Sequence, residues 1–196
     1  MNDEAALVSR CLRHEPDAMR ELVQRFQNDV FAVAFRTLGH RQDAEDVCQD
    51  VFLRVFRSLR RWDPTRPLKP WILRIAVNCC RSNFRKRSRR PASHESLDNF
   101  AVTPPKDDSA ELAQEIGRAV DLLRFDHRLV FNLYHAEGMP YDQIAEVVGR
   151  PIGTVKTWLH RARLEVFRRL IERGMLEDGT LLSHSLLKNS NVSNTE

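Results

Sequence analysis

Hydrophobic residues recur along this chain at three- and four-residue steps, the spacing that places them on one face of an α-helix. A first helix is predicted to begin with Asp17 as its cap and to end at Gly39. A second helix follows with the clearest apolar stripe, and charged residues lie opposite that stripe. The stripe contains Ala44, Val47, Cys48, Val51, Phe52, Val55, Phe56 and Leu59. The pattern therefore favours helices over strands.

Prolines divide the first half of the chain. Pro64 and Pro67 interrupt the helical pattern, because proline cannot continue a helix interior. A third helix is predicted from about Leu68 to Arg87. Its predicted buried residues are Ile72, Ile75, Ala76 and Cys79.

The second half has the pattern of a helix-turn-helix. A helical pattern over residues 110–136 is stopped by Gly138. Two helices are predicted after it, over residues 141–148 and 152–173, and a tight turn at Gly149-Arg150-Pro151 joins them. A short helix, a tight turn and a longer basic helix are typical of this motif.

Together these patterns predict an all-α fold class, with two helical domains joined by a flexible linker. The predicted domains are residues 5–90 and 111–173. Residues 91–110, rich in Pro, Ser, Asp and Asn, form the predicted linker. The tail, residues 174–196, is rich in Ser and Asn toward its end and is expected to be disordered.

Composition narrows the class of protein. No run of apolar residues among the 196 is long enough to span a membrane, and the acidic N-terminus does not have the pattern of a signal peptide. Four cysteines without metal-ligand spacing favour a reducing compartment, so a cytoplasmic location is expected. Only 7 glycines disfavour a Gly-rich phosphate-binding enzyme.

The formal net charge of +4 conceals a strong segregation. Residues 51–90 contain thirteen basic side chains and one acidic side chain, a net charge of +12. Residues 150–173 contain seven basic and two acidic, a net charge of +5. Residues 2–50 and 91–116 are acidic, at −4 and −5. Two basic blocks separated by acidic segments favour contact with nucleic acid, although a solvated helix face remains an alternative for either block.

Each basic block places candidate binding residues on one helix face. In the predicted third helix a polar stripe contains Trp71, Arg74, Asn78, Arg81 and Arg85. Aromatic rings and cations in such a stripe suit single-stranded bases and their backbone, whereas Trp62 is better explained as a core or loop anchor. The last helix is predicted to turn seven residues outward near its start, where a recognition helix contacts DNA. These are Gly153, Thr154, Lys156, Thr157, His160, Arg161 and Arg163.

A nucleic-acid enzyme, such as a nuclease or deaminase, is the least favoured alternative. It would need a metal site or paired acid–base residues, and the seven histidines are scattered without such spacing. No catalytic residue, metal ligand or cofactor is predicted. Cys79, on the apolar stripe beside Cys80, is predicted to be a small core residue rather than a redox centre.

Four motifs together resemble bacterial sigma factors of the extracytoplasmic-function class within the sigma-70 family. They occur in the family's order and span most of residues 5–172. The motifs are residues 43–53 (DAEDVCQDVFL), 71–78 (WILRIAVN), 141–146 (YDQIAE) and 153–163 (GTVKTWLHRAR). Such proteins contain sigma domains 2 and 4, which would correspond here to the two predicted domains.

This resemblance implies a subunit of RNA polymerase that directs promoter-specific transcription initiation and has no catalytic activity of its own. It assigns the acidic helix to the core polymerase, the third helix to melted minus-ten bases, and the last helix to the minus-thirty-five duplex. The residues implied for core polymerase are Asp46, Gln49 and Asp50. Those implied for minus-ten DNA are Trp71, Arg74, Asn78, Arg81 and Arg85. Those implied for minus-thirty-five DNA are Thr154, Lys156, Thr157, His160 and Arg161.

The implied partners are core RNA polymerase and promoter DNA. The resemblance leaves open whether an anti-sigma factor binds the chain and holds it at the inner membrane. A regulator that binds duplex DNA without polymerase is the main alternative, and it would leave the acidic face of residues 43–50 unused. The chain departs from the family pattern at Leu68, Phe125, Arg150 and Trp158.

Overall fold

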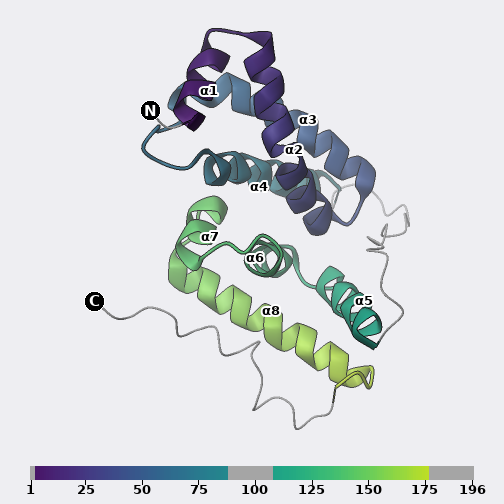
Figure 1. Ribbon diagram of the computed structural model, residues 1–196. Coiled ribbons are helices and arrows are strands. Elements are labelled where there is room, and N and C mark those ends of the chain that lie inside the picture. Colours follow the sequence, from purple (N-terminus) through teal and green to yellow (C-terminus); the bar gives the residue numbers. More distant parts are fainter. Residues whose placement is uncertain (1–2, 88–107, 177–196) are drawn as a thin grey trace.

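A computed structural model describes residues 3–87 and 108–176. Within them the chain is helical, with no strand. Figure 1 shows two helical units stacked on each other. The first contains α1 (Asp3–Leu12), α2 (Pro16–Leu38), α3 (Arg41–Ser58), the short 3₁₀ helix η1 (Leu59–Arg61) and α4 (Leu68–Arg87). The second contains α5 (Asp108–Asp121), α6 (Phe125–His135), α7 (Tyr141–Val148) and α8 (Ile152–Glu172). The all-α prediction and the two helical units are confirmed.

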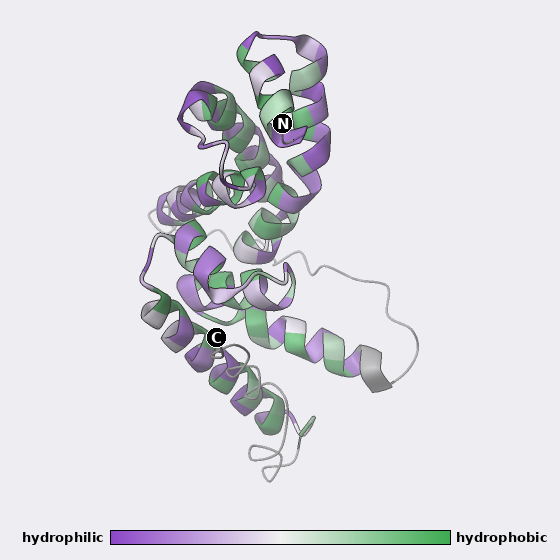
Figure 2. Cartoon of the chain, turned by 60° about the vertical axis from the view of Figure 1, so that its left-hand side comes forward, coloured by the Kyte–Doolittle hydropathy of each residue, from purple (hydrophilic) through white to green (hydrophobic). Residues whose placement is uncertain are grey.

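The first unit is built on the mutual packing of α2, α3 and α4. Each of these helices carries both hydrophobic and hydrophilic residues (Figure 2), and the hydrophobic stripe is the buried one. The stripe predicted for α3 is buried or half-buried along its whole length. Trp62, directly after η1, is also buried, as expected for a core anchor.

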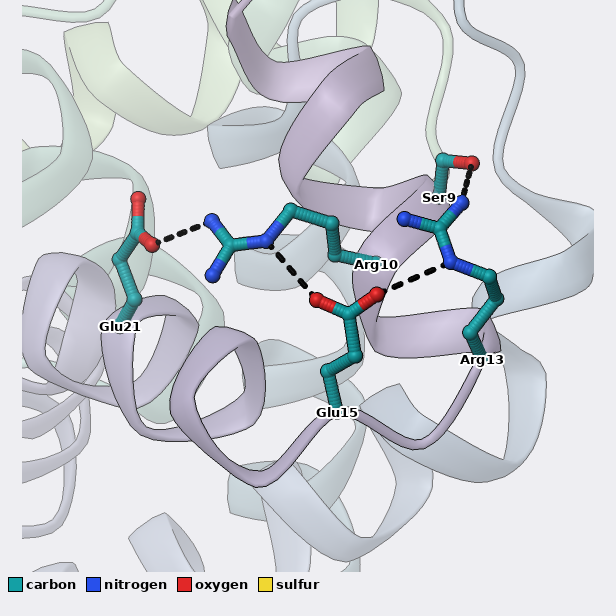
Figure 3. A network of polar contacts seen from close by, with 5 residues as sticks. All are labelled: Ser9, Arg10, Arg13, Glu15 and Glu21. Atoms are coloured by element: carbon teal, nitrogen blue, oxygen red, sulfur yellow. Dashed lines mark hydrogen bonds and ion pairs between the residues drawn. The ribbon is translucent and has the colours of Figure 1, made fainter.

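The short helix α1 was not predicted, because its apolar residues 5–8 are consecutive and give no clear three- or four-residue spacing. Its buried residues are Leu7, Val8 and Cys11. A chain reversal joins it to α2, with His14 in the left-handed region at φ 60°. Figure 3 shows how this corner is held together: Glu15 accepts hydrogen bonds from Arg10 and Arg13, and Arg10 also bonds Glu21 on α2. The bonds from Arg13 and Arg10 lower the pKa of Glu15.

Two boundaries differ from prediction. Helix α2 starts at Pro16 with Glu15 at its N-cap position, so Asp17 lies in the first turn and does not cap the helix. Proline suits this position because its missing N–H would be unpaired there. The helical pattern over residues 110–136 is divided into α5 and α6, because Arg124 has an extended backbone, at ψ 149°.

In the second unit, α8 packs against α5, α6 and α7. The predicted stripe of α8 is buried as expected; its residues are Val155, Leu159, Ala162, Val166 and Leu170. None of the helices in the described ranges is long and apolar enough to cross a membrane. The predictions of a flexible linker and a disordered tail fall largely outside the described residues.

Two glycines provide a matched test of the helix boundaries. Gly149 ends α7 in the left-handed region at φ 66°, whereas Gly117 lies inside α5, and a Cβ at either position would meet nothing within 4 Å. Gly149→Ala should therefore lower the free energy of unfolding by about 1 kcal/mol, through backbone strain alone. Gly117→Ala should raise it by roughly 0.5–1 kcal/mol. Chemical denaturation of the full chain measures both, and changes of the same sign would contradict the assigned boundaries.

Candidate nucleic-acid interface

The predicted polar stripe of the third helix lies along one face of α4. Its residues are Trp71, Arg74, Asn78, Arg81 and Arg85. Arg74, Asn78 and Arg85 are exposed, while Trp71 and Arg81 are half-buried. The opposite face of the helix lies in the core, where Ile72, Ala76 and Cys80 are fully buried. The buried face therefore fixes the rotation of α4 and the direction in which the stripe points.

The loop before α4 is ordered by its own polar side chains. Asp63 Oδ1 accepts hydrogen bonds from the Thr65 backbone N–H at 2.9 Å and from its hydroxyl at 2.7 Å. These bonds lower the pKa of Asp63. Leu68, one of the departures from the family pattern, is fully buried and anchors the first turn of α4. It is therefore part of the core in this structure.

Arg81 contacts the second unit. Its Nη1 donates to the Val148 carbonyl at the end of α7, at 2.9 Å, and its Nη2 lies 3.5 Å from Asp126 on α6. Its side chain is 19% exposed. Phe84, one turn further along α4, packs against Phe125 with 4.9 Å between the ring centroids. The basic face of α4 is thus shared with the start of α6 and the end of α7.

Every ion pair described between the two units joins a cation of the first to a carboxylate of the second. Arg36 on α2 lies 2.7 Å from Glu137, and Lys69 on α4 lies 3.8 Å from the same carboxylate. The Glu137 side chain is only 8% exposed, so solvent screens it little. Arg66 pairs with Glu146 at 2.7 Å. Together with Arg81 and Asp126, these residues define what we call the ionic interface.

The predicted recognition surface of the second unit is the first half of α8. Lys156, Thr157, His160 and Arg161 are exposed, and Thr154 is half-buried. The Lys156 ammonium lies 5.8 Å from the centroid of the Tyr141 ring, at the start of α7. A cation over an aromatic face is attracted to it, so Tyr141 restrains this lysine. Sequence reasoning missed Tyr141, because the contact spans two helices.

Arg163 does not face outward, contrary to the prediction. It is buried, its Nε donates to His135 Nε2 at 3.2 Å, and its guanidinium lies 4.8 Å from the Tyr134 ring centroid. Desolvation by the surrounding protein, with a smaller contribution from this guanidinium, lowers the pKa of His135 to about 4. The neutral imidazole can accept the hydrogen bond, and Arg163 thereby ties α8 to α6.

The acidic face of α3 divides into paired and unpaired residues. Asp43 lies 2.8 Å from Arg87 at the end of α4, and Glu45 lies 2.9 Å from Arg41. The other three polar residues of this face are exposed, and none forms an ion pair within the described ranges. They are Asp46, Gln49 and Asp50. Leu53, one turn further on, is 55% exposed and adds an apolar side chain to this part of the surface.

Three cysteines lie on the facing helices α3 and α4. Burial raises the pKa of Cys48 to about 11, and it also raises the pKa of Cys79 and Cys80. The thiols are therefore protonated at neutral pH and behave as small apolar groups, in line with the core role predicted for Cys79. In residues 3–87 and 108–176, no group of three His, Cys, Asp or Glu side chains is arranged to hold a metal ion.

Comparison with known families matches both units. The family described as Sigma-70 region 2 matches residues 22–90, and the family described as Sigma-70, region 4 matches residues 113–166. The first match begins within α2 and ends after α4. The second begins within α5 and ends within α8. Helix α1 lies outside both.

Curated relatives and solved structures are similar over most of the chain. The extracytoplasmic-function RNA polymerase sigma-E factor of Haemophilus influenzae is 31% identical, over 82% of this chain and 91% of its own. SigE of Mycolicibacterium smegmatis is 31% identical over 74% of this chain, and the aligned part covers 59% of that longer relative.

Among solved structures, the sigma factor RpoE of Bartonella quintana, in complex with the anti-sigma factor NepR, has a TM-score of 0.64 at 26% identity. That likeness covers 78% of this chain and 96% of the other. CnrH in complex with the cytosolic domain of CnrY has a TM-score of 0.62 at 26% identity, over 85% and 96% of the two chains.

The ionic interface can be tested through Glu137, which faces two cations of the first unit. Glu137→Gln should weaken the packing of the two units, because a buried carboxylate paired with cations is replaced by a neutral amide. We expect a larger radius of gyration in small-angle X-ray scattering, with a greater increase at high salt. Glu21→Gln is the matched control, since its exposed ion pair lies within the first unit. An unchanged radius for Glu137→Gln at every salt concentration would contradict the importance of this carboxylate.

Proposed function

We propose that this chain, which belongs to the extracytoplasmic-function sigma factors of the sigma-70 family, captures melted minus-ten bases with α4 and contacts the minus-thirty-five duplex with α8. As a sigma factor it directs transcription initiation by RNA polymerase. The proposal that α4 captures melted bases rests on the stripe along this helix. The stripe places the half-buried indole of Trp71 in line with the exposed amide of Asn78 and the exposed guanidinium groups of Arg74 and Arg85. In this proposal sigma domain 2 covers residues 5–90 and sigma domain 4 covers residues 111–173.

The α4 stripe supplies the interactions that an unstacked strand needs. Flipping a base out of the duplex costs a few kcal/mol, which stacking and pocket contacts must offset. Trp71 offers a ring for stacking, and stacking on an aromatic side chain contributes roughly 1–3 kcal/mol per base. Asn78 and Arg74 offer polar contacts to the bases, while Arg81 and Arg85 are placed to follow the phosphates.

Arg81 reaches DNA only when the ionic interface opens. Its guanidinium is bonded to Val148 and lies beside Asp126, so those contacts must be exchanged for phosphate. Interfaces between domains of one chain commonly permit such relative motion. We therefore propose that the closed arrangement separates when the chain takes its place on promoter DNA.

The face of α8 is suited to reading a duplex. Thr154, Lys156, Thr157, His160 and Arg161 lie in its first half, the part of a recognition helix that approaches base edges in the major groove. Lys156, Thr157 and His160 are proposed to read the minus-thirty-five element. Thr154 and Arg161 are proposed to contact the backbone. Arg163 is excluded from this set because it is buried against α6.

The exposed part of the α3 face is proposed to bind core RNA polymerase. The carboxylates of Asp46 and Asp50 are not neutralised by ion pairs within the described chain, so they are available to a basic partner surface. One similar structure contains a sigma factor bound to an anti-sigma factor, and another contains CnrH bound to the cytosolic domain of CnrY. We propose that an anti-sigma factor also binds this chain. The proposed location is the cytoplasm.

The acidic face gives a first prediction. Gln49→Ala combined with Asp50→Ala should weaken binding to core polymerase by roughly tenfold or more, since hydrogen bonds to charged groups contribute about 1.5–3 kcal/mol. Fluorescence titration with labelled chain measures this affinity. Glu45→Ala is the matched control on the same helix, because Glu45 already pairs with Arg41. Unchanged affinity of the double variant would disprove the assignment.

The α4 stripe gives a second prediction, which tests the main proposal. Trp71→Ala or Asn78→Ala should reduce promoter opening, detected by permanganate reactivity of unpaired thymines, by roughly tenfold. Binding to closed duplex promoter should change much less. Asn28→Ala on α2, also an exposed asparagine, should resemble the unmodified chain. Equal losses in opening and in duplex binding would count against base capture by this stripe.

The α8 face gives a third prediction. Substituting Lys156 or His160 with Ala should alter the preferred minus-thirty-five sequence, because a good base contact contributes about 1–3 kcal/mol of discrimination. Arg161→Ala should lower affinity for all sequences alike and reduce the salt dependence by about one ion. Arg168→Ala, on the second half of α8 and paired with Glu172, is the control. Selection from a randomised duplex library measures the preference, and an unaltered preference would overturn this assignment.

A further inference from the structure

We propose that Glu4 is a positioning residue for base capture: its carboxylate, supplied by α1, holds the first turn of α4 and with it the loop of residues 63–67. This inference rests on the proposed function of the α4 stripe. It concerns a segment outside the two matched family regions, since α1 ends at Leu12 and the first match begins at residue 22.

The contact is a hydrogen bond from one helix to the start of another. The Leu68 backbone N–H, the first of α4, donates to Glu4 Oε2 at 2.9 Å. The first N–H groups of a helix have no partner within the helix, and the helix dipole favours a negative charge beside them. Glu4 therefore does for α4 what an N-cap side chain does, although it lies 64 residues earlier in the chain.

The position of Glu4 is itself fixed from both ends of α1. Near its start, Arg25 on α2 lies 2.6 Å from Asp3 and 3.9 Å from Glu4. At its other end the cluster of Arg10, Glu15 and Glu21 ties α1 to α2 (Figure 3). The Glu4 side chain is only 16% exposed, so solvent competes weakly for its carboxylate. The hydrogen bond to Leu68 is thus presented by a rigid support.

The first turn of α4 is where such a support affects function. Trp71 follows Leu68 by three residues, so a shift of this turn moves the ring that is proposed to stack on a base. On the other side of the turn, the loop is closed by the bonds between Asp63 and Thr65. Lys69, which pairs with Asp29 on α2 at 2.8 Å, provides a second restraint on the same turn. Loss of the Glu4 bond should therefore loosen the turn without unfolding the unit.

The experiment compares three variants of the full chain bound to core polymerase. Glu4→Ala removes the acceptor, and Glu4→Gln keeps a neutral acceptor oxygen of the same length. Asp17→Ala, the matched control, removes an exposed carboxylate of α2 that pairs with Arg20 on the same helix. Permanganate-detected promoter opening and affinity for a nontemplate-strand minus-ten oligonucleotide report base capture. Core-polymerase affinity, minus-thirty-five duplex binding and melting temperature report the integrity of the chain.

We expect Glu4→Ala to reduce opening and oligonucleotide affinity by roughly fivefold, the scale of a lost helix cap. Core-polymerase affinity and duplex binding should be retained. Glu4→Gln should recover most of the loss, and Asp17→Ala should match the unmodified chain.

Opening by Glu4→Ala equal to that of the unmodified chain would overturn the inference. So would a parallel loss in every readout, which would indicate a purely structural role. Failure of the unmodified chain to bind the oligonucleotide would overturn the proposed function, and this inference with it.

Discussion

The placement of α4 is the constraint on which the rest of the structure depends. Its inner face, with fully buried Ile72, Ala76 and Cys80, is packed between α2 and α3, so the helix cannot rotate without exposing that core. Its outer face is consequently fixed as a line of polar and basic groups around Trp71. Because α4 also touches α7, the same helix connects the two units. We therefore expect a change at either end of α4 to affect both the stripe that is proposed to bind DNA and the contact between the two units.

The contact between the two units depends largely on ion pairs. The second unit contributes three carboxylates that each lie beside a cation of the first unit: Asp126, Glu137 and Glu146. These carboxylates neutralise part of the positive charge of residues 51–90. Exposed ion pairs contribute little individually, but the nearly buried Glu137 is shared by two cations and is screened less by solvent. In the proposed function phosphates compete for some of these basic side chains, so we expect promoter DNA to weaken the contact between the two units. The modest net charge of +4 is the sum of strongly basic and strongly acidic segments.

Much of this could be predicted from the sequence, because long amphipathic helices carry a strong periodic signal. The stripes of α3 and α8 and the start of α4 at Leu68 were predicted correctly on that basis. Helix α1 and the break at Arg124 were not predicted. The apolar residues 5–8 of α1 are consecutive and hide its period, and the break at Arg124 contains neither Gly nor Pro. Arg163 follows the buried Leu159 by four residues, so the period alone places it beside the buried stripe. It was misplaced because arginine is usually exposed, whereas here it packs against His135 and Tyr134. The contacts of Glu4 and Arg81 join residues far apart in the chain, and they require the tertiary structure. The roles of individual DNA-facing residues remain predictions.

The central claim is that this chain gives core RNA polymerase the ability to recognise and open specific promoters. In vitro transcription from genomic DNA fragments, with purified core polymerase in the presence and absence of the chain, tests it most directly. The account predicts transcripts that appear only when the chain is added, with start sites that share one minus-ten and one minus-thirty-five sequence and become permanganate-reactive near minus ten. An identical set of transcripts with and without the chain would contradict the account.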